Sequence, residues 1–331
     1  MSSTPSVDKS SSISVIIPFY QRDPGILRRA LDSIRMQTYR GSMEVLVVDD
    51  ASPVPAEEST RGLQLPENIQ IRTVRQNNGG PASARNRGLR ERSRTSQFVA
   101  FLDSDDAWSP EHLERAVAAL RAGATFYFAD HFQLEQRVSA FDRARRIDTT
   151  RHEKIAALDE AYFFQGDMCD QILLGNVIGT STVVFDAQRH PGIQFREEFF
   201  SAGEDYLCWM DFASDGARFA FSMRPEATYG RGVNVYSGAA WGTDAHLVRI
   251  QNEIRFLQTA NRIHRLSEAA QRHVAARHRA LHGDFVGSLI QRIRSKREVP
   301  WGIALEQTRK TPLMTAWGVM AYARKKLRRE R

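Results

Sequence analysis

The chain has 331 residues, which is typical of about two domain-sized units, with 42% hydrophobic and 26% charged residues. This composition is that of an ordinary globular chain and excludes a fibrous or mostly disordered one. Its two cysteines, Cys169 and Cys208, argue against a disulfide framework and favour a reducing compartment. No apolar run approaches the roughly 20 residues that a membrane-spanning helix needs.

The net charge of +7 is unevenly distributed along the chain. Residues 242–331 contain 19 Lys or Arg against 7 Asp or Glu, whereas residues 1–241 contain 27 against 32. The first eleven residues are Ser-rich and polar, without the apolar core of a signal peptide. We therefore expect a disordered lead-in over 1–11, a catalytic domain over 12–241 and a basic helical region over 242–331.

Apolar and β-branched runs predict five strands in the first part of the chain, over 13–20, 43–52, 69–74, 97–103 and 124–130. Apolar residues at helical spacing predict a helix over 23–38, and a Gly-Pro turn opens into a predicted basic helix over 77–92. Ser109 as N-cap, Pro110 at the first position and Gly123 as stop predict a helix over 109–123. Strands that are apolar throughout and alternate with helices indicate an α/β fold. Its sheet is expected to be mostly parallel and covered by helices on both faces.

Polar residues gather where these predicted strands end. Tyr20 and Asp50 lie at the ends of the first two predicted strands, Asp103 ends the fourth, and Asp105 and Asp106 follow it. Ligands of open α/β sheets bind outside the carboxyl ends of the strands. Three carboxylates in four positions suit a hard divalent cation, since Mg²⁺ and Mn²⁺ prefer oxygen ligands. The alternative is that these carboxylates stabilise only the positive end of the following helix.

Five motifs in this order resemble those of the family 2 glycosyltransferases with the GT-A fold: "SVIIPFY", "EVLVVDDAS", "NNGGPASARNRGL", "FLDSDDAW" and "GEDYLCW". The resemblance covers roughly residues 12–235. It implies a Rossmann-like, mostly parallel sheet and transfer of a sugar from a nucleoside diphosphate, usually with inversion, assisted by Mn²⁺ or Mg²⁺. The Gln-x-x-Arg-Trp motif of processive members is missing, which implies transfer of single sugars.

The resemblance also implies roles for individual residues. The residues expected to bind the nucleotide-sugar, with a UDP-sugar as the expected donor, are Pro18, Tyr20, Asp50, Arg85, Asn86, Asp103 and Asp105. Among them, Tyr20 would stack on the base and Asp50 would accept a hydrogen bond from uracil or its equivalent. Arg85 would reach the base or the diphosphate, and Asn86 would support the turn around it.

Two pairs of carboxylates are expected to carry the chemistry. Asp105 and Asp106 would hold the metal, although the extra carboxylate at Asp103 leaves the division of roles among the three open. Asp205 would be the general base that deprotonates the acceptor hydroxyl, with Glu204 holding a neighbour or the acceptor. The alternative for Glu204 and Asp205 is that they favour only the dipole of their own helix.

The C-terminal part predicts basic helices, including a stripe of Leu247, Ile250, Ile254 and Leu257. Residues 311–331 combine apolar residues at helical spacing with six Lys or Arg among the last nine. Such a segment suits an anionic membrane surface, and the alternative is a helix docked on the rest of the protein. The expected location is cytoplasmic, as a peripheral protein on the inner face of the membrane.

The expected acceptor of the transferase is a glycan or a lipid-linked glycan. Two other classes of function are alternatives to a transferase. A non-catalytic module that binds nucleotide-sugars or glycans would not need to keep the metal carboxylates and a candidate base together. A nucleic-acid-binding protein would suit the sequence pI of about 9.6. The basic excess lies outside the motif-bearing region and lacks interleaved aromatic residues, so no nucleic-acid partner is expected.

Overall fold

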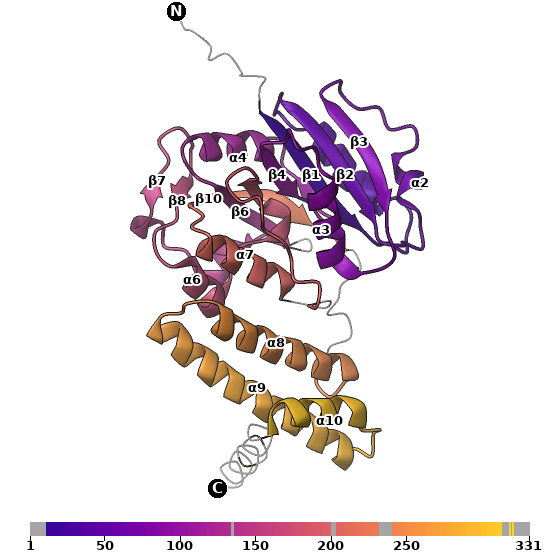
Figure 1. The fold of residues 1–331 in the computed structure, drawn as a ribbon, viewed down its shortest axis with the longest axis vertical. Helices are drawn as coiled ribbons and strands as arrows, with labels where there is room; N and C mark the ends of the chain where they lie inside the picture. The colour runs from indigo at the N-terminus through magenta and orange to yellow at the C-terminus, as the bar shows by residue number, and fades with distance from the viewer. Residues whose placement is uncertain are drawn as a thin grey trace, which may run out of the picture. The chain divides into compact units, whose positions relative to one another are not determined.

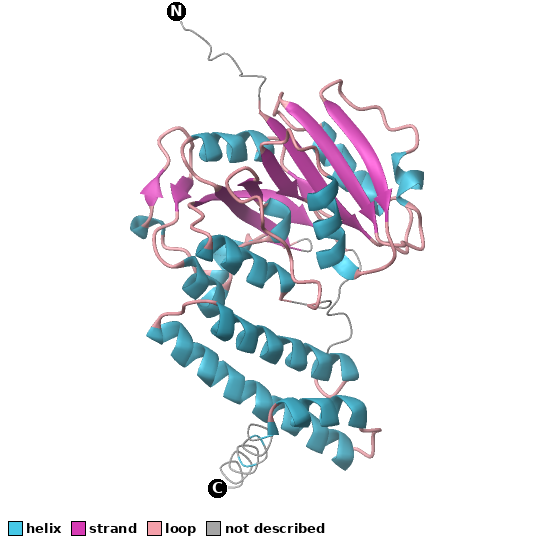
Figure 2. Cartoon of the chain, viewed as in Figure 1, coloured by secondary structure: helices cyan, strands magenta, loops and turns pink. Residues whose placement is uncertain are grey.

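The computed structural model describes residues 11–133, 136–199, 203–231 and 240–312, together with 318 and 320 (Figure 2). The chain forms two compact units, which are described separately. The first unit is Met1–Phe200 with Cys208–Val233, and the second is Ser201–Leu207 with Asn234–Arg331. The lead-in over 1–11 lies outside the described residues except for Ser11, which is buried. The domain boundary expected after residue 241 remains a prediction.

The first four strands form the parallel half of the sheet in the first unit (Figure 1). They are β1 (Ser12–Phe19), β2 (Ser42–Asp49), β3 (Ile69–Arg75) and β4 (Phe98–Phe101), in the spatial order β3-β2-β1-β4. In register, Phe19 of β1 pairs with Asp49 of β2, which pairs with Arg75 of β3. These strands therefore end together at one edge of the sheet, as the sequence predicted.

The sheet continues beyond β4 with strands of mixed direction. Strand β9 lies antiparallel between β4 and β6, and β10 returns parallel to β6. Short β5 and β8 pair with β10 in antiparallel fashion, and β7 pairs with β8. The bounds are β5 (Ala107–Trp108), β6 (Phe126–Gln133), β7 (Glu153–Lys154), β8 (Ala161–Phe163), β9 (Val184–Asp186) and β10 (Phe219–Tyr229). The predicted strand over 124–130 corresponds to β6.

Helices cover both faces of this sheet (Figure 2). Their bounds are α1 (Ile26–Arg35), α2 (Ala56–Thr60), α3 (Gly80–Glu91), α4 (His112–Arg121), α5 (Ala140–Ala144), α6 (Met168–Gly175) and α7 (Glu204–Ser214), with 3-10 turns η1 (Thr149–Arg151) and η2 (Thr180–Thr182). Helix α1 buries Leu27, Leu31 and Ile34, at helical spacing, in the same core as Val15 and Val45. The apolar periodicity of the sequence thus becomes the packing of helix on sheet.

The described part of the second unit includes α8 (Asp244–Ile263), α9 (Glu268–Arg294) and α10 (Trp301–Lys310), together with the first turn of α7. Side-chain caps begin the first two: Thr243 Oγ1 accepts from His246 N at 3.2 Å, and Ser267 Oγ accepts from Ala270 N at 3.2 Å. The predicted apolar stripe of α8 is buried, which confirms it.

No helix among the described residues is both long and apolar enough to span a bilayer. The segment expected to bind membranes, 311–331, lies outside the described residues except for 311, 312, 318 and 320. Gly318 lies against α9, since a Cβ added there would come within 2.8 Å of His282 O and 3.0 Å of a Val286 methyl.

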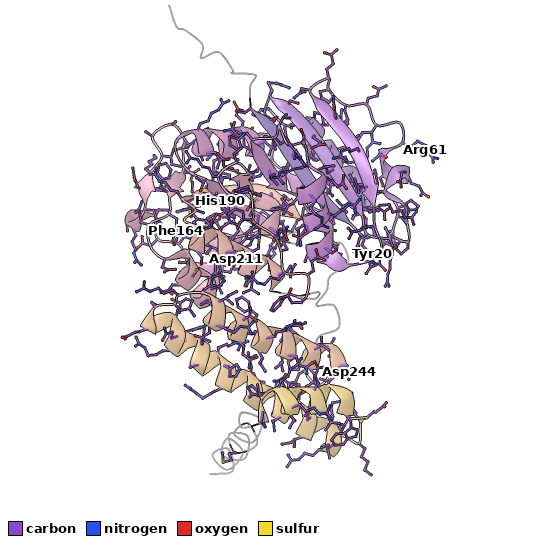
Figure 3. The ribbon with its side chains drawn as sticks, in the orientation of Figure 1. Tyr20, Arg61, Phe164, His190, Asp211 and Asp244 are labelled. Carbon is purple, nitrogen blue, oxygen red and sulfur yellow. The ribbon has the colours of Figure 1, made fainter. Side chains whose placement is uncertain are left out.

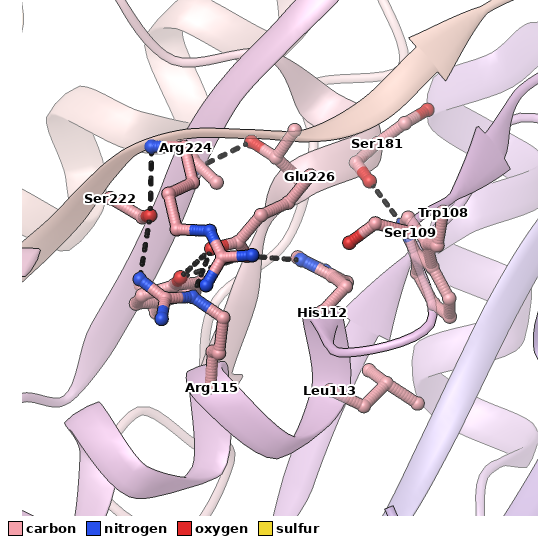
Figure 4. Close-up of polar contacts among 12 residues, drawn as sticks. Trp108, Ser109, His112, Leu113, Arg115, Ser181, Ser222, Arg224 and Glu226 are labelled. Atoms are coloured by element: carbon pink, nitrogen blue, oxygen red, sulfur yellow. Dashed lines mark hydrogen bonds and ion pairs between the residues drawn. The ribbon is translucent and has the colours of Figure 1, made fainter. Parts of the chain in front are cut away.

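A buried ionic network joins α4, β6 and β10 (Figure 4). The carboxylate of Glu226, on β10, accepts hydrogen bonds from Arg115 Nε at 2.7 Å and from Tyr127 OH at 2.8 Å. It also lies 2.9 Å from His112 Nδ1. Arg115 Nη2 reaches Ser222 Oγ at 3.1 Å. Each charged group has a partner, which is the condition for burying charges without a large penalty.

The environment decides the ionisation of this network. Burial raises the pKa of Glu226, but the hydrogen bonds and charges of His112 and Arg115 outweigh it, so the net pKa is lowered. Burial raises the pKa of Tyr127 well above its usual range, and the charge of Glu226 raises it further. Glu226 is therefore ionised and Tyr127 neutral at physiological pH, which makes the phenol a donor to the carboxylate.

Glu226→Ala is expected to destabilise the protein by about 3–5 kcal/mol, because it leaves Arg115 buried without its counter-charge. The midpoint of urea unfolding measures the change. The control is Glu58→Ala on the exposed side of α2, where we expect a change of about 0.5 kcal/mol or less. Equal losses in the two variants would contradict a structural role for the network.

The network also predicts a dependence of stability on pH. The folded pKa of Glu226 is lowered, so its stabilisation is present above the unfolded pKa of a glutamate and is lost as the pH falls through the folded pKa. Wild-type protein should therefore lose more stability on acidification than Glu226→Gln, in which this position cannot titrate. Parallel curves of unfolding free energy against pH would argue against this assignment.

Candidate active site

The ends of β1, β2 and β4 are tied together by polar side chains. Gln21 N donates to Ser52 Oγ at 2.9 Å, and Ser52 Oγ donates back to Gln21 O at 2.9 Å. Gln21 Nε2 donates to Ser104 Oγ at 2.9 Å. Tyr20, which precedes Gln21, is half-buried at the edge toward which these strands run (Figure 3). Pro18, two residues before Tyr20, is also half-buried, so both predicted base-pocket residues lie near this edge.

Asp50 organises the start of α3. Its Oδ1 accepts from Gly79 N and its Oδ2 from Gly80 N, both at 2.8 Å, and Gln76 Nε2 donates to Oδ1 at 2.8 Å. Gly80 has φ +81°, a conformation that side chains rarely adopt, and it brings its N–H to the carboxylate. A carboxylate at a helix N-terminus satisfies donors that the helix leaves unpaired. Asp50 therefore builds the turn itself, and its contact with a base remains a prediction.

Helix α3 carries two of the predicted donor-site residues. Arg85 Nη2 donates to Asp103 Oδ1 at 2.7 Å, and its guanidinium lies 5.3 Å from the centre of the Phe195 ring. Asn86 is buried, and its amide binds the segment before α7: Nδ2 donates to Phe195 O at 2.8 Å and Oδ1 accepts from Phe195 N at 2.7 Å. Nδ2 also donates to Glu197 Oε1 at 2.9 Å.

The acidic motif after β4 brings three carboxylates into different environments. Asp103 is 33% exposed in its side chain and pairs with Arg85. Asp105 is half-buried, whereas Asp106 is only 3% exposed. Asp106 Oδ2 accepts from Ser181 Oγ at 2.5 Å, and its Oδ1 accepts from Gly230 N at 2.9 Å. The motif thus presents two partly accessible carboxylates around a buried one.

Gly230, directly after β10, lies close to the backbone of the acidic motif. A Cβ added at this position would come within 1.9 Å of Asp105 O, so no side chain fits there without a shift of the backbone. This close approach lets Gly230 N reach Asp106. The sequence analysis did not single out Gly230, although a glycine just after a strand is a recognised signal of close backbone approach.

Ser181 is a further residue that the sequence analysis missed. Its Oγ accepts from Asp103 N at 3.0 Å while donating to Asp106, and its carbonyl accepts from Trp108 Nε1 at 2.5 Å. The side chain is fully buried in η2, just before β9. Ser181 therefore holds both ends of the acidic motif. Nothing in its local sequence, a run of small polar residues, marks this role.

The electrostatics of Asp106 favour a cation. Burial raises the pKa of Asp106 well above its usual range, and the charges of Asp103 and Asp105 raise it further, while the bonds from Ser181 and Gly230 act in the opposite direction. A positive charge beside Asp106 would favour its ionised form.

The described residues contain no preformed cluster of three or more His, Cys, Asp or Glu side chains for a metal ion. Magnesium is usually bound by one or two carboxylates together with phosphates of the substrate, so such a cluster is not required. Asp105 and Asp106 provide two adjacent carboxylates at the strand-end edge. This donor set fits Mn²⁺ or Mg²⁺ shared with a diphosphate.

Glu204 and Asp205 form the first turn of α7. Glu204 is 9% exposed, Asp205 is half-buried, and Asp205 Oδ1 accepts from Tyr206 N at 2.8 Å. Carboxylates in the first turn of a helix are stabilised by its dipole. These two residues group with the second unit, whereas the acidic motif belongs to the first. Their juxtaposition with Asp106 therefore remains a prediction.

Ser181→Ala is expected to destabilise the protein by about 1–3 kcal/mol, because Asp103 N–H and Asp106 each lose a buried partner. Urea unfolding measures this loss. The matched control is Ser33→Ala in α1, where the buried hydroxyl donates only to Ala30 O of its own helix, at 2.7 Å. Since alanine is the better helix former, that control should change stability little. Indistinguishable midpoints would contradict the bridging role of Ser181.

Comparison with known proteins agrees with this arrangement. The model of the family described as glycosyl transferase family 2 matches residues 14–187. The succinoglycan biosynthesis protein ExoW of Rhizobium meliloti (strain 1021) is 34% identical over 241 residues, which cover 68% of this chain and 71% of that protein. The residues that the family model matches include the strand-end edge and the acidic motif.

Two solved structures share the fold. S. aureus TarS 1-349 in complex with UDP-GlcNAc has a TM-score of 0.56 at 20% identity, covering 94% of this chain and 89% of that chain. The mannosyltransferase PcManGT from Pyrobaculum calidifontis, in complex with GDP-Man and Mn2+, has a TM-score of 0.53 at 19% identity, covering 95% and 86%. At these identities the likeness concerns the fold alone. The chain belongs to glycosyl transferase family 2, and its α/β fold with a mostly parallel sheet is the GT-A fold that the sequence predicted.

Proposed function

We propose that the protein transfers a single sugar, with inversion, from a nucleoside diphosphate donor to a hydroxyl of a glycan or a lipid-linked glycan. The observation that carries this proposal is that buried Arg85 pairs with Asp103, one of three carboxylates at the carboxyl edge of the parallel sheet. Arginine and a metal held by carboxylates are the groups that stabilise a departing diphosphate.

The relatives support the class of donor and acceptor. The TarS structure contains UDP-GlcNAc, the PcManGT structure contains GDP-Man and Mn2+, and ExoW is named for succinoglycan biosynthesis. We propose a UDP-sugar as the donor and an intermediate of polysaccharide assembly as the acceptor. A panel of nucleotide-sugars, tested for metal-dependent hydrolysis, would show whether a GDP-sugar is used instead.

Residues at the strand-end edge are proposed to bind the donor. Pro18 and Tyr20 would line the base pocket, and Asp103 or Asp105 would meet the ribose. Arg85, held by Asp103, would face the diphosphate. Asn86 would act indirectly, by fixing the segment at Phe195 to α3.

The chemistry is proposed to follow a single displacement. Asp105 and Asp106 would hold Mn²⁺ or Mg²⁺, which when bound supplies positive charge to the leaving diphosphate. Asp205 would take the proton of the acceptor hydroxyl as its oxygen attacks the anomeric carbon, and the bond to the diphosphate oxygen breaks. Glu204 would hold the acceptor or orient its neighbour.

A cytoplasmic location is proposed with this function. Cys169 and Cys208 are both buried and not joined in a disulfide, and burial raises the pKa of Cys169 to about 12. Thiols of this kind are unreactive and need no oxidising compartment. We propose a peripheral position on the inner membrane face together with this location.

Asp106→Asn tests the metal assignment, because it keeps the size of the side chain and removes its charge. Metal-dependent donor hydrolysis should fall at least about tenfold, since one charged ligand is lost. The control Asp32→Asn, on the exposed side of α1, should leave the rate unchanged. An unaltered rate and metal dependence in Asp106→Asn would overturn the assignment.

Asp205→Asn tests the base. The rate of transfer should fall on the order of 10²-fold or more, which is the contribution of a positioned general base. Donor affinity should hardly change, because the base faces the acceptor. Glu204→Gln is the matched comparison and should cost less. If donor affinity collapsed together with turnover, Asp205 would instead be a binding or folding residue.

A further inference from the structure

Exposed large apolar side chains gather near the end of α9 and on α10. Ile293 is 56% exposed, Trp301 63% and Leu305 56%. These three residues, which we call the α10 face, fall within thirteen positions of one another along the chain. Scattered single apolar residues are normal on protein surfaces, whereas a local group of large ones marks an interaction site.

Helix α10 turns its large apolar side chains away from its own unit. Its buried positions are Ala304 and Gln307, followed by Thr311, which are small or polar. Gln251 Nε2 of α8 donates to Ile303 O at 3.1 Å and so holds this inner side in place. Trp301 and Leu305, four residues apart, lie on one stripe beside this inner side. Packing within the described part of the unit therefore does not account for them.

The link between α9 and α10 is compact. Arg297 N donates to Arg292 O at 3.0 Å, and Arg292 Nε donates to Glu298 O at 2.8 Å. These bonds fold residues 295–300 back on the end of α9, and Figure 1 shows α10 beside that end. Ile293 and Trp301 therefore flank one short turn.

Exposed cations are frequent in the segment that carries the α10 face. Residues 292–310 contain six Lys or Arg and two Glu. The exposed ones are Arg294, Lys296, Arg297, Arg309 and Lys310. Of the two glutamates, Glu306 pairs with Lys310 on the same helix, and Glu298 is exposed. The combination of apolar side chains with a basic rim is typical of a helix that lies in a membrane interface.

We propose that the α10 face docks on a membrane that contains anionic phospholipids. Trp301 would insert at the level of the headgroups, where tryptophan is enriched, and Leu305 and Ile293 would enter the acyl boundary. The exposed cations would meet lipid phosphates. This proposal does not depend on the transferase activity, and it places membrane contact on described residues that precede the segment 311–331.

The charge of the α10 face disfavours two other partners, a second copy of the protein and the C-terminal residues of the same chain. A second copy would bring one basic rim against another, and the last nine residues of the chain are themselves basic, with six Lys or Arg. Like charges at close range disfavour both contacts. Nucleic acid would satisfy the cations but offers no partner to exposed leucine and isoleucine. An anionic bilayer satisfies both features of the surface.

The test uses the full-length chain and vesicles of phosphatidylcholine alone or with an equal amount of phosphatidylglycerol. We expect binding only to the anionic vesicles, and weaker binding as salt increases. Trp301→Ser combined with Leu305→Ser should reduce the affinity at least about tenfold. Arg294→Gln with Arg297→Gln and Arg309→Gln should reduce it as well, and should flatten the salt dependence.

Leu174→Ser with Val138→Ser is the matched control, since these side chains are 51% and 53% exposed in the first unit. It should bind like the wild type. Quenching of tryptophan fluorescence by brominated lipid should diminish in Trp301→Phe, which keeps an apolar ring. Circular dichroism of each variant checks that its helices persist.

Three results would overturn the proposal. The first is wild-type protein that ignores anionic vesicles. The second is unchanged binding in the Trp301 and Leu305 double variant, which would transfer any membrane contact to other residues. The third is a wild-type dimer in sedimentation equilibrium that the double variant dissociates, because the face would then be the contact between two copies.

Discussion

The position of β10 depends on the buried carboxylate of Glu226, and the active-site edge depends on β10. Arg115 of α4 and Tyr127 of β6 hold Glu226 from two sides. Four residues further along the chain, Gly230 gives its N–H to Asp106. A shift of β10 would therefore remove a donor from the buried carboxylate of the acidic motif. Strand β10 therefore links the buried ionic network to the candidate metal site.

Two buried carboxylates of the first unit, those of Glu226 and Asp106, differ in how the fold compensates their burial. Glu226 has the positive charge of Arg115 beside it, and its net pKa is lowered. Asp106 has hydrogen bonds from a hydroxyl and an amide, but its charged neighbours Asp103 and Asp105 raise its pKa. The first carboxylate is already compensated within the fold. A cation beside the second carboxylate would favour its ionised form, which supports the proposal that a metal binds there.

Helix α3 connects three of the predicted donor-site residues to the framework of the site. Asp50 binds the start of the helix, Arg85 pairs with Asp103 of the acidic motif, and Asn86 donates to the backbone at Phe195. The sequence analysis assigned all three to the donor site. In the structure, Asp50 bonds to the start of α3 and Asn86 bonds to the segment at Phe195, so both residues build the framework of the site. One side of the donor site and the segment leading to α7 are thereby joined by a single helix.

The sequence by itself determined the four parallel strands, the helices between them and the acidic motif at their ends. Apolar runs and strand-end positions are properties of consecutive residues, so they can be read locally. Only the tertiary structure decided that β9 enters the sheet antiparallel, and that Ser181 and Gly230 hold Asp106. Those partners lie 75 and 124 residues away along the chain. The exposed stripe of α10 was likewise invisible, because periodicity shows that a helix has an apolar side but not which side its neighbours cover. A buried polar group is satisfied by whichever distant segment packs against it, and no local pattern records that choice.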